Sequence, residues 1–411
     1  MKAILTNSII LLILFPVKLL SQPFPESVNT NNKTCTVEPI EKVELSISLI
    51  LNDDESSHSK EKKKKAISKQ IKIANCLYGK KKYQELLEFL KNLNQQINLY
   101  TSLGLDNEIF ELFFLRGKAL RAIGNWQQAS SAFKAALNIS QAHPTTIESE
   151  KLSDLYFNLG RTYRMLNDYT LALDYFNQTL TICIESDFCP KERQAKIYIY
   201  MGDCYKFLGK KDLSYIQFKK ATSVIDNLQE STRNQILILL LQIKGRMHNY
   251  FDEYDDAVQC LEKGIKLCQR EYGLYHEKTA YRIDALGNTY YYLKKYSKAI
   301  IKFQEAVDVF KALGSKNNYA IADGYSKIAA CYTNLNDFQK AEHYLDSCFR
   351  ILEFDRDIDH PFEEYRSSHT HLLIILYFKA KNHQKAYEAG LGTEELQEAA
   401  YWFNLCVELI E

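Results

Sequence analysis

Aromatic, small and apolar residues return along this chain at a nearly constant interval of roughly 42–45 residues. An aromatic residue follows a short polar stretch at six of the steps, and Lys211 and His383 occupy the other two. The six aromatic positions are Tyr83, Trp126, Tyr169, Tyr254, Tyr296 and Phe338. An interval of this length predicts stacked helix pairs, because one pair cannot bury its apolar face alone.

Small residues keep the same register. A glycine stands nine residues before the recurring position and an alanine three residues after it, as in Gly160 and Ala172 around Tyr169. A large apolar residue such as Phe176 follows the alanine by four. Each unit therefore reads as two antiparallel helices joined by a tight turn, with glycine allowing the two axes to approach. The pattern predicts an all-α solenoid of about eight helix pairs.

This pattern resembles the tetratricopeptide repeat over residues 67–390. The segments LYFNLGRTYRMLNDYTLALDYFNQTL (155–180) and DALGNTYYYLKKYSKAIIKFQEAV (284–307) carry the resemblance. The interval exceeds the 34 residues usual for that family and is similar to the kinesin light chain subgroup. The resemblance implies a right-handed superhelix. The apolar segment 391–411 then fits two roles, a helix that caps the last repeat or a contact between copies.

The first 66 residues differ from the repeats. Residues 1–21 have the features of a secretory signal: Lys2, an apolar run over 9–15, and a plausible cleavage point near Ser21. This predicts an exported, periplasmic or secreted protein, with an uncleaved anchor or a buried helix as alternatives. The run is shorter than the roughly 20 residues that span a bilayer, so no membrane span is expected after leader removal. Residues 22–66 form a polar N-terminal extension.

Composition and motifs argue against several classes of function. The formal net charge is +1, which gives no bulk electrostatic footprint for nucleic acid. The chain has no nucleophile elbow, phosphate-binding glycine loop, CxxC or HExxH motif. His369 and His371 are two residues apart on an expected helix, so they point in different directions and make a poor metal pair. We therefore expect no enzyme activity, cofactor or metal.

The chain contains 10 cysteines. Cys204 and Cys331 occupy a small, packed repeat position and are interpreted as core residues. Cys183 and Cys189 flank a short loop between repeats, so they are the one candidate disulfide.

The resemblance also implies where a ligand would bind. In tetratricopeptide arrays the first helices of successive units line a concave groove. The groove-facing positions lie one and four residues after the repeat glycine and three before it. In this sequence those positions hold six cations and two aromatic residues: Lys118, Arg121, Arg161, Arg164, Lys206, Arg246, Phe114 and Phe157.

Cations spaced three apart share a helix face, and arginine can hold a carboxylate through two parallel hydrogen bonds. We therefore predict a non-enzymatic adaptor that binds an extended, acidic peptide with an apolar anchor. The plainer interpretation is that these cations are solvated or ion-paired helix residues. A second functional interpretation is a sensor or regulatory module acting on a separate effector, or an assembly subunit that oligomerises through the C-terminal helix.

Overall fold

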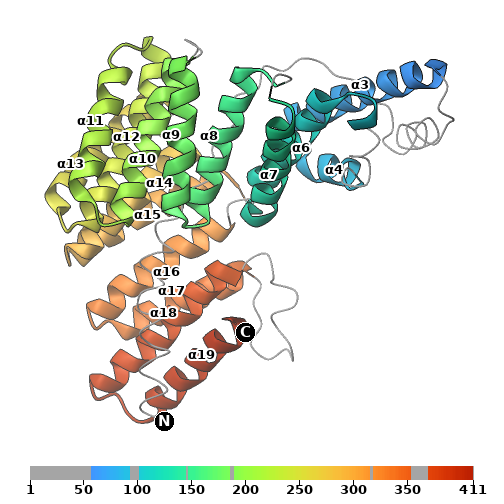
Figure 1. Cartoon of the computed structure of the whole chain (residues 1–411). Coiled ribbons are helices and arrows are strands. Elements are labelled where there is room, and N and C mark those ends of the chain that lie inside the picture. Colours follow the sequence, from blue (N-terminus) through green and yellow to red (C-terminus); the bar gives the residue numbers. More distant parts are fainter. Residues whose placement is uncertain are drawn as a thin grey trace. The chain divides into compact units, whose positions relative to one another are not determined.

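The computed structural model describes residues 57–92, 101–144, 147–185, 189–314, 318–352 and 369–410. The expected signal segment (1–21) and residues 22–56 of the extension lie outside this range. Within it, every regular element is a helix (Figure 1), so the all-α prediction is confirmed. No described helix is long and apolar enough to cross a bilayer.

The described helices form eight consecutive pairs, as predicted, and fall into two compact units divided near residue 224. The first unit contains α3 (Ser57–Gly79), α4 (Tyr83–Phe89), α6 (Asp106–Ala122), α7 (Trp126–Ala142), α8 (Ser149–Met165), α9 (Tyr169–Glu185), α10 (Lys191–Phe207) and α11 (Lys211–Ile225). The second contains α12 (Glu230–Tyr250), α13 (Tyr254–Tyr272), α14 (Glu277–Tyr292), α15 (Tyr296–Ala312), α16 (Asn318–Asn334), α17 (Phe338–Leu352), α18 (His369–Glu388) and α19 (Glu394–Ile410).

The turn inside a pair repeats one backbone conformation. The residue two positions before the second helix has a positive φ in seven pairs, and only two of these residues are glycine. They are Lys81, Gly124, Asn167, Gly209, Asp252, Lys294 and Asn336. The next residue donates its backbone N–H to a carbonyl five positions back, as Asp168 does to Tyr163 at 3.0 Å. This left-handed residue closes the first helix and turns the chain into the second.

The glycine register marks the closest approach of the two helices. A Cβ added at Gly160 would lie 2.7 Å from the ring of Phe176, and one added at Gly202 would lie 2.4 Å from Phe218. The same relation holds for Gly117, Gly287 and Gly245, the last with a leucine as partner. The predicted role of glycine is thus confirmed, and its partner is the large apolar residue on the second helix.

Two boundaries differ from the prediction. Helix α3 already begins at Ser57, inside the expected extension, because a buried face with helical spacing starts at Lys63 and continues through Ala66 and Gln70. His383 does not open a second helix. It lies within α18, and the turn follows later, at Gly390 and Gly392, which both have positive φ. The predicted C-terminal helix is α19, which packs against α18 as the second helix of the last pair.

Candidate functional site

Cations of the first unit lie on aromatic rings supplied by its first helices. Phe114, Lys118 and Arg121 follow one another by four and three residues on α6 and therefore share a face. The Lys118 Nζ atom is 4.3 Å from the ring centre of Tyr78 on α3 and 5.3 Å from that of Phe114. Lys118 thus links α3 to α6 through an ammonium placed over two rings.

The next helix repeats this arrangement. The Arg161 guanidinium carbon is 5.5 Å from the ring centre of Phe157 on α8 and 5.7 Å from that of Tyr200 on α10. Arg164 lies 4.7 Å from the same Tyr200 ring. We call the set Tyr78, Phe114, Lys118, Arg121, Phe157, Arg161 and Tyr200 the cation–aromatic surface.

Two of the predicted cations instead belong to a buried ion cluster. Arg164 Nη1 donates to Asp203 Oδ2 at 2.7 Å, and Lys206 Nζ donates to Asp203 Oδ1 at 2.7 Å. Lys206 is 1% exposed and Asp203 is fully buried. These two cations therefore neutralise a carboxylate inside the unit and join α8 to α10, rather than presenting charge to a ligand. Sequence reasoning missed Asp203 as their partner.

Of the cations that remain on the surface, Lys118 and Arg121 lie close together on α6. Burial lowers the pKa of Lys118, and the carboxylates of Asp154 and, more weakly, Glu111 oppose this effect. The Asp154 carboxylate is shared, because Arg193 on α10 pairs with it. Among the described residues, Arg121 has no hydrogen-bond or ion-pair partner, and its Nε is buried without one. Arg121 also lowers the pKa of Lys118, which shows two like charges close together.

The pKa of Tyr78 is affected by the same cations. Burial raises the pKa of its hydroxyl, and the charges of Arg121 and Arg161 both oppose that rise. Cations from α6 and α8 therefore act on one phenol of α3. An anion placed here would meet several cations, and the two carboxylates that act on Lys118, Asp154 and Glu111, already have other partners.

The eighth predicted residue, Arg246, lies on α12 and is described with the second unit. There its charge opposes the rise in the pKa of Tyr292 that burial causes. The first helices of this unit are better balanced. Lys327 Nζ lies 2.8 Å from Asp284 and 2.6 Å from Asp323. Burial alone would lower the pKa of Lys327, but the two carboxylates raise it well above its ordinary value.

The candidate disulfide is not formed in this structure. Cys183 and Cys189 are both free thiols. Burial, and then a hydrogen bond with Cys183, raise the pKa of Cys189 to about 12. The two side chains therefore lie close together, but no disulfide joins them.

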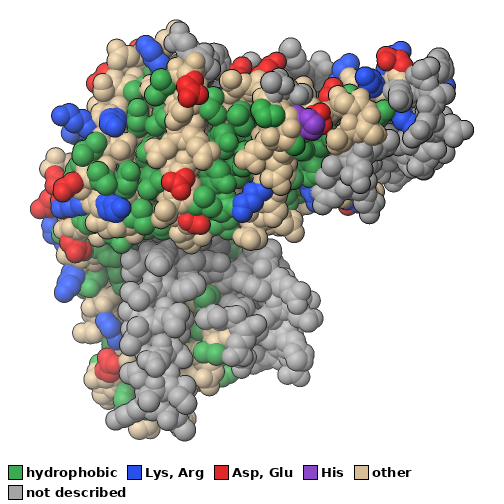
Figure 2. Space-filling model, in the orientation of Figure 1, with side chains coloured by type: hydrophobic (Ala, Val, Ile, Leu, Met, Phe, Trp, Pro, Cys, Tyr) green, Lys and Arg blue, Asp and Glu red, His purple; other side chains and the backbone are tan. Residues whose placement is uncertain are grey.

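One group of side chains in the described part of the chain has metal-like geometry. His248, Glu253 and Asp256 each offer a ligand atom, all within 4.8 Å of one another. The imidazole Nδ1 is already 2.7 Å from Glu253, which ties the end of α12 to the start of α13. On the face shown in Figure 2, Lys and Arg side chains are scattered among neutral and acidic ones rather than gathered in one broad patch.

The sequence profile of the tetratricopeptide repeat matches residues 108–185 and 235–312. These stretches cover α6 to α9 and α12 to α15, whose second helices begin at the recurring position. The chain therefore contains tetratricopeptide repeats over these residues. Its repeats are similar to those of the Arabidopsis thaliana protein kinesin light chain-related 3, with 18% identity over 53% of this chain and 33% of that protein. The chain thus spans about a third of this relative's length.

The fold of this tetratricopeptide array is also found in solved structures. The apo form of the quorum sensor NprR from B. thuringiensis superimposes with a TM-score of 0.61 and 13% identity, over 90% of this chain and 99% of NprR. NprR in complex with its cognate peptide NprX gives a TM-score of 0.54 at 13% identity, over 90% and 92%. Apo RapI gives 0.52 at 12% identity, over 84% and 97%. At these identities the likeness establishes the fold alone.

Proposed function

We propose that this protein is a non-enzymatic interaction module that captures an extended, acidic protein segment on the cation–aromatic surface of its first unit. The observation that carries the proposal is the excess of cations at Lys118, Arg121 and Arg161, where Arg121 has no partner among the described residues. The array fold supports it, since NprR, which shares that fold, has been solved with a peptide.

The aromatic residues extend the chemistry beyond charge. Phe114 is half-buried, and Phe157 is 9% exposed beneath Arg161. An apolar side chain of the ligand would pack on the accessible parts of these rings, while neighbouring carboxylates accept hydrogen bonds from the guanidinium groups. Because Arg164 and Lys206 are committed to Asp203, they are not part of the proposed contact set.

Charge reversal tests this surface. We expect Arg121→Glu and Arg161→Glu each to weaken binding of a fluorescein-labelled, Asp/Glu-rich peptide with one central Leu by about tenfold or more, since each removes a charge-assisted contact. Fluorescence anisotropy measures the affinity. Raising the salt towards ~1 M, where the Debye length is about 3 Å, should weaken binding to the parent protein.

Two controls isolate the charge effect. The exposed Lys219 on α11 provides a matched reversal, and Lys219→Glu should leave the affinity unchanged. A peptide in which Asn and Gln replace Asp and Glu should bind much more weakly. If the parent protein binds both peptides equally, or if both arginine variants bind like the parent, the acidic-segment proposal is wrong.

A regulatory role is the second candidate. It is favoured by the likeness of the whole array to the quorum sensor NprR, which covers 90% of this chain. In that case the captured segment would be a signal, and the output would lie in a separate effector protein.

Export is also a proposal. Cys76 on α3 is disulfide-bonded, and disulfides persist mainly in oxidising compartments. If the full-length chain is expressed with its leader, N-terminal sequencing of the exported protein should begin near Gln22. Recovery of the protein only inside the cell, with Met1 retained, would contradict export.

A further inference from the structure

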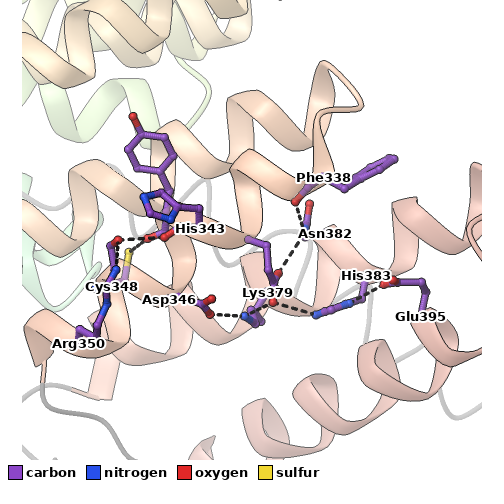
Figure 3. A network of polar contacts seen from close by, with 12 residues as sticks. Phe338, His343, Asp346, Cys348, Arg350, Lys379, Asn382, His383 and Glu395 are labelled. Atoms are coloured by element: carbon purple, nitrogen blue, oxygen red, sulfur yellow. Dashed lines mark hydrogen bonds and ion pairs between the residues drawn. The ribbon is translucent and has the colours of Figure 1, made fainter.

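Among the described residues, one hydrogen-bonded ion pair joins the last helix to the rest of its unit. His383 on α18 places Nδ1 2.6 Å from Glu395 Oε2 on α19. Among the described side chains of α19, no other hydrogen bond or ion pair reaches another helix. Figure 3 shows His383 pointing from α18 towards Glu395. The orientation of α19 therefore depends on this contact, on Lys379 Nζ, which lies 5.5 Å from the ring centre of Trp402, and on apolar packing.

The same imidazole faces a second carboxylate. Its Nε2 lies 3.6 Å from Glu342 Oε1 on α17, too far for a hydrogen bond, and is buried without a hydrogen-bond partner. Glu342 also pairs with Lys379 and accepts a hydrogen bond from Asn382 Nδ2 at 3.2 Å. Lys379 Nζ in turn lies 2.7 Å from Asp346 on α17. The charged groups around His383 are thus Glu342 and Asp346 from α17, Lys379 from α18, and Glu395 from α19.

The apolar contact of α19 leaves a polar group unsatisfied. Trp402 is 2% exposed and stacks on Phe349 of α17, with ring centres 5.5 Å apart and planes inclined by 16°. Its indole N–H is buried without a hydrogen-bond partner, which costs free energy that an exposed indole would not lose. On its outer side α19 exposes Leu396, Tyr401 and Val407. The helix is therefore held on one face only.

We propose that His383 is a pH-sensitive clasp that holds the C-terminal helix α19 onto α18 when the imidazole is charged. An imidazolium carries an N–H on both ring nitrogens, so its positive charge attracts Glu342 while Nδ1 donates to Glu395. A neutral imidazole donates from one nitrogen only and leaves the other carboxylate facing a lone pair. Deprotonation therefore weakens the attachment of α19 and gives access to the apolar surface around Phe349.

The direction of the pH effect follows from the two partners. Burial alone would lower the pKa of His383, but the neighbouring carboxylates of Glu342 and Glu395 raise it above its ordinary 6.5. Burial alone would raise the pKa of Glu342, but His383 and Lys379 lower it to about 2. The contribution of His383 to the stability of the α19 attachment is complete below about pH 6.5. It is lost as the pH rises through the raised pKa of His383. The contribution of Glu342 to that stability is present above about pH 4.5 and is lost as the pH falls towards 2.

The fluorescence of Trp402 can report when the attachment of α19 weakens. The chain has 2 tryptophans, so Trp126→Phe leaves Trp402 as the sole one, and Phe338 already occupies the position equivalent to Trp126. Acrylamide quenching of Trp402 in the full-length protein, measured from pH 5.5 to 9, follows the exposure of the α19 contact. We expect quenching to rise severalfold above pH 6.5, with a midpoint at the raised pKa of His383.

Two substitutions test whether the pH response comes from His383 rather than from other titrating groups. In the same background, His383→Gln should give quenching that no longer changes with pH, and Glu395→Gln should move the midpoint down towards 6.5. His143, which lies 3.6 Å from Asp106 in the other unit, supplies the control, and His143→Gln should keep the parent response. Circular dichroism checks that each variant is folded. The clasp proposal is wrong if quenching of the parent protein does not change with pH. It is also wrong if His383→Gln keeps the parent response, or if the midpoint does not move in Glu395→Gln.

Discussion

At the scale of single residues, the glycine of each pair determines how close its two helices lie. Gly160 sits beneath the Phe176 ring, at a distance where a Cβ atom would overlap two ring carbons. Gly264 on α13 is a useful contrast, because a Cβ there would meet only Leu241 at an ordinary 3.5 Å. The same substitution should therefore have opposite effects at the two positions.

We predict that Gly160→Ala lowers the free energy of unfolding by about 1–3 kcal/mol, since the buried ring cannot move without disturbing its neighbours. Gly264→Ala should raise it by about 0.5–1 kcal/mol, because alanine is the better helix former. Urea unfolding followed by circular dichroism compares the two. Equal effects of the two substitutions would show that helix propensity, and not the contact with Phe176, decides the outcome.

The candidate site shows which side-chain contacts the repeat register could not predict. Register alone placed Lys118 and Arg161 on first helices, and both lie over aromatic rings in the structure. Register could not show that Arg164 and Lys206 turn inward. That outcome depends on Asp203, which occupies the same repeat position as Lys118 and Arg161 but with opposite charge. A buried carboxylate draws in nearby cations because an unpaired buried charge is costly.

At the scale of elements, the repeat register predicted the start of the second helix in seven pairs, from Tyr83 to Phe338. This worked because the preceding turn has one geometry, with a left-handed residue two positions earlier. The last pair departs from it. Lys381 stands two residues before His383, and although Lys81 and Lys294 turn the chain at the equivalent position, α18 continues to Glu388 and the chain turns after it. The array was predicted to begin at residue 67, whereas α3 begins at Ser57 and its buried face already includes Lys63.

At the scale of the whole molecule, stability in a repeat array is close to a sum of terms from each repeat and its neighbours. Such arrays need not unfold in one cooperative step. The described residues form two compact units, and each contains one of the two tryptophans: Trp126 in the first and Trp402 in the second. Each unit can therefore be followed by its own fluorescence.

We predict that Gly160→Ala destabilises the first unit selectively. With Trp126 as the only tryptophan, in a Trp402→Phe background, the substitution should lower the urea midpoint by about 1 M, given slopes of about 1–3 kcal/mol per molar. With Trp402 as the only tryptophan, in a Trp126→Phe background, the midpoint should stay in place. Equal shifts at both reporters would mean that the array unfolds as one unit. A shift seen only with Trp126 would show that the destabilisation caused by Gly160→Ala stays within the first unit. The C-terminal clasp and the cation–aromatic surface could then be altered independently of one another.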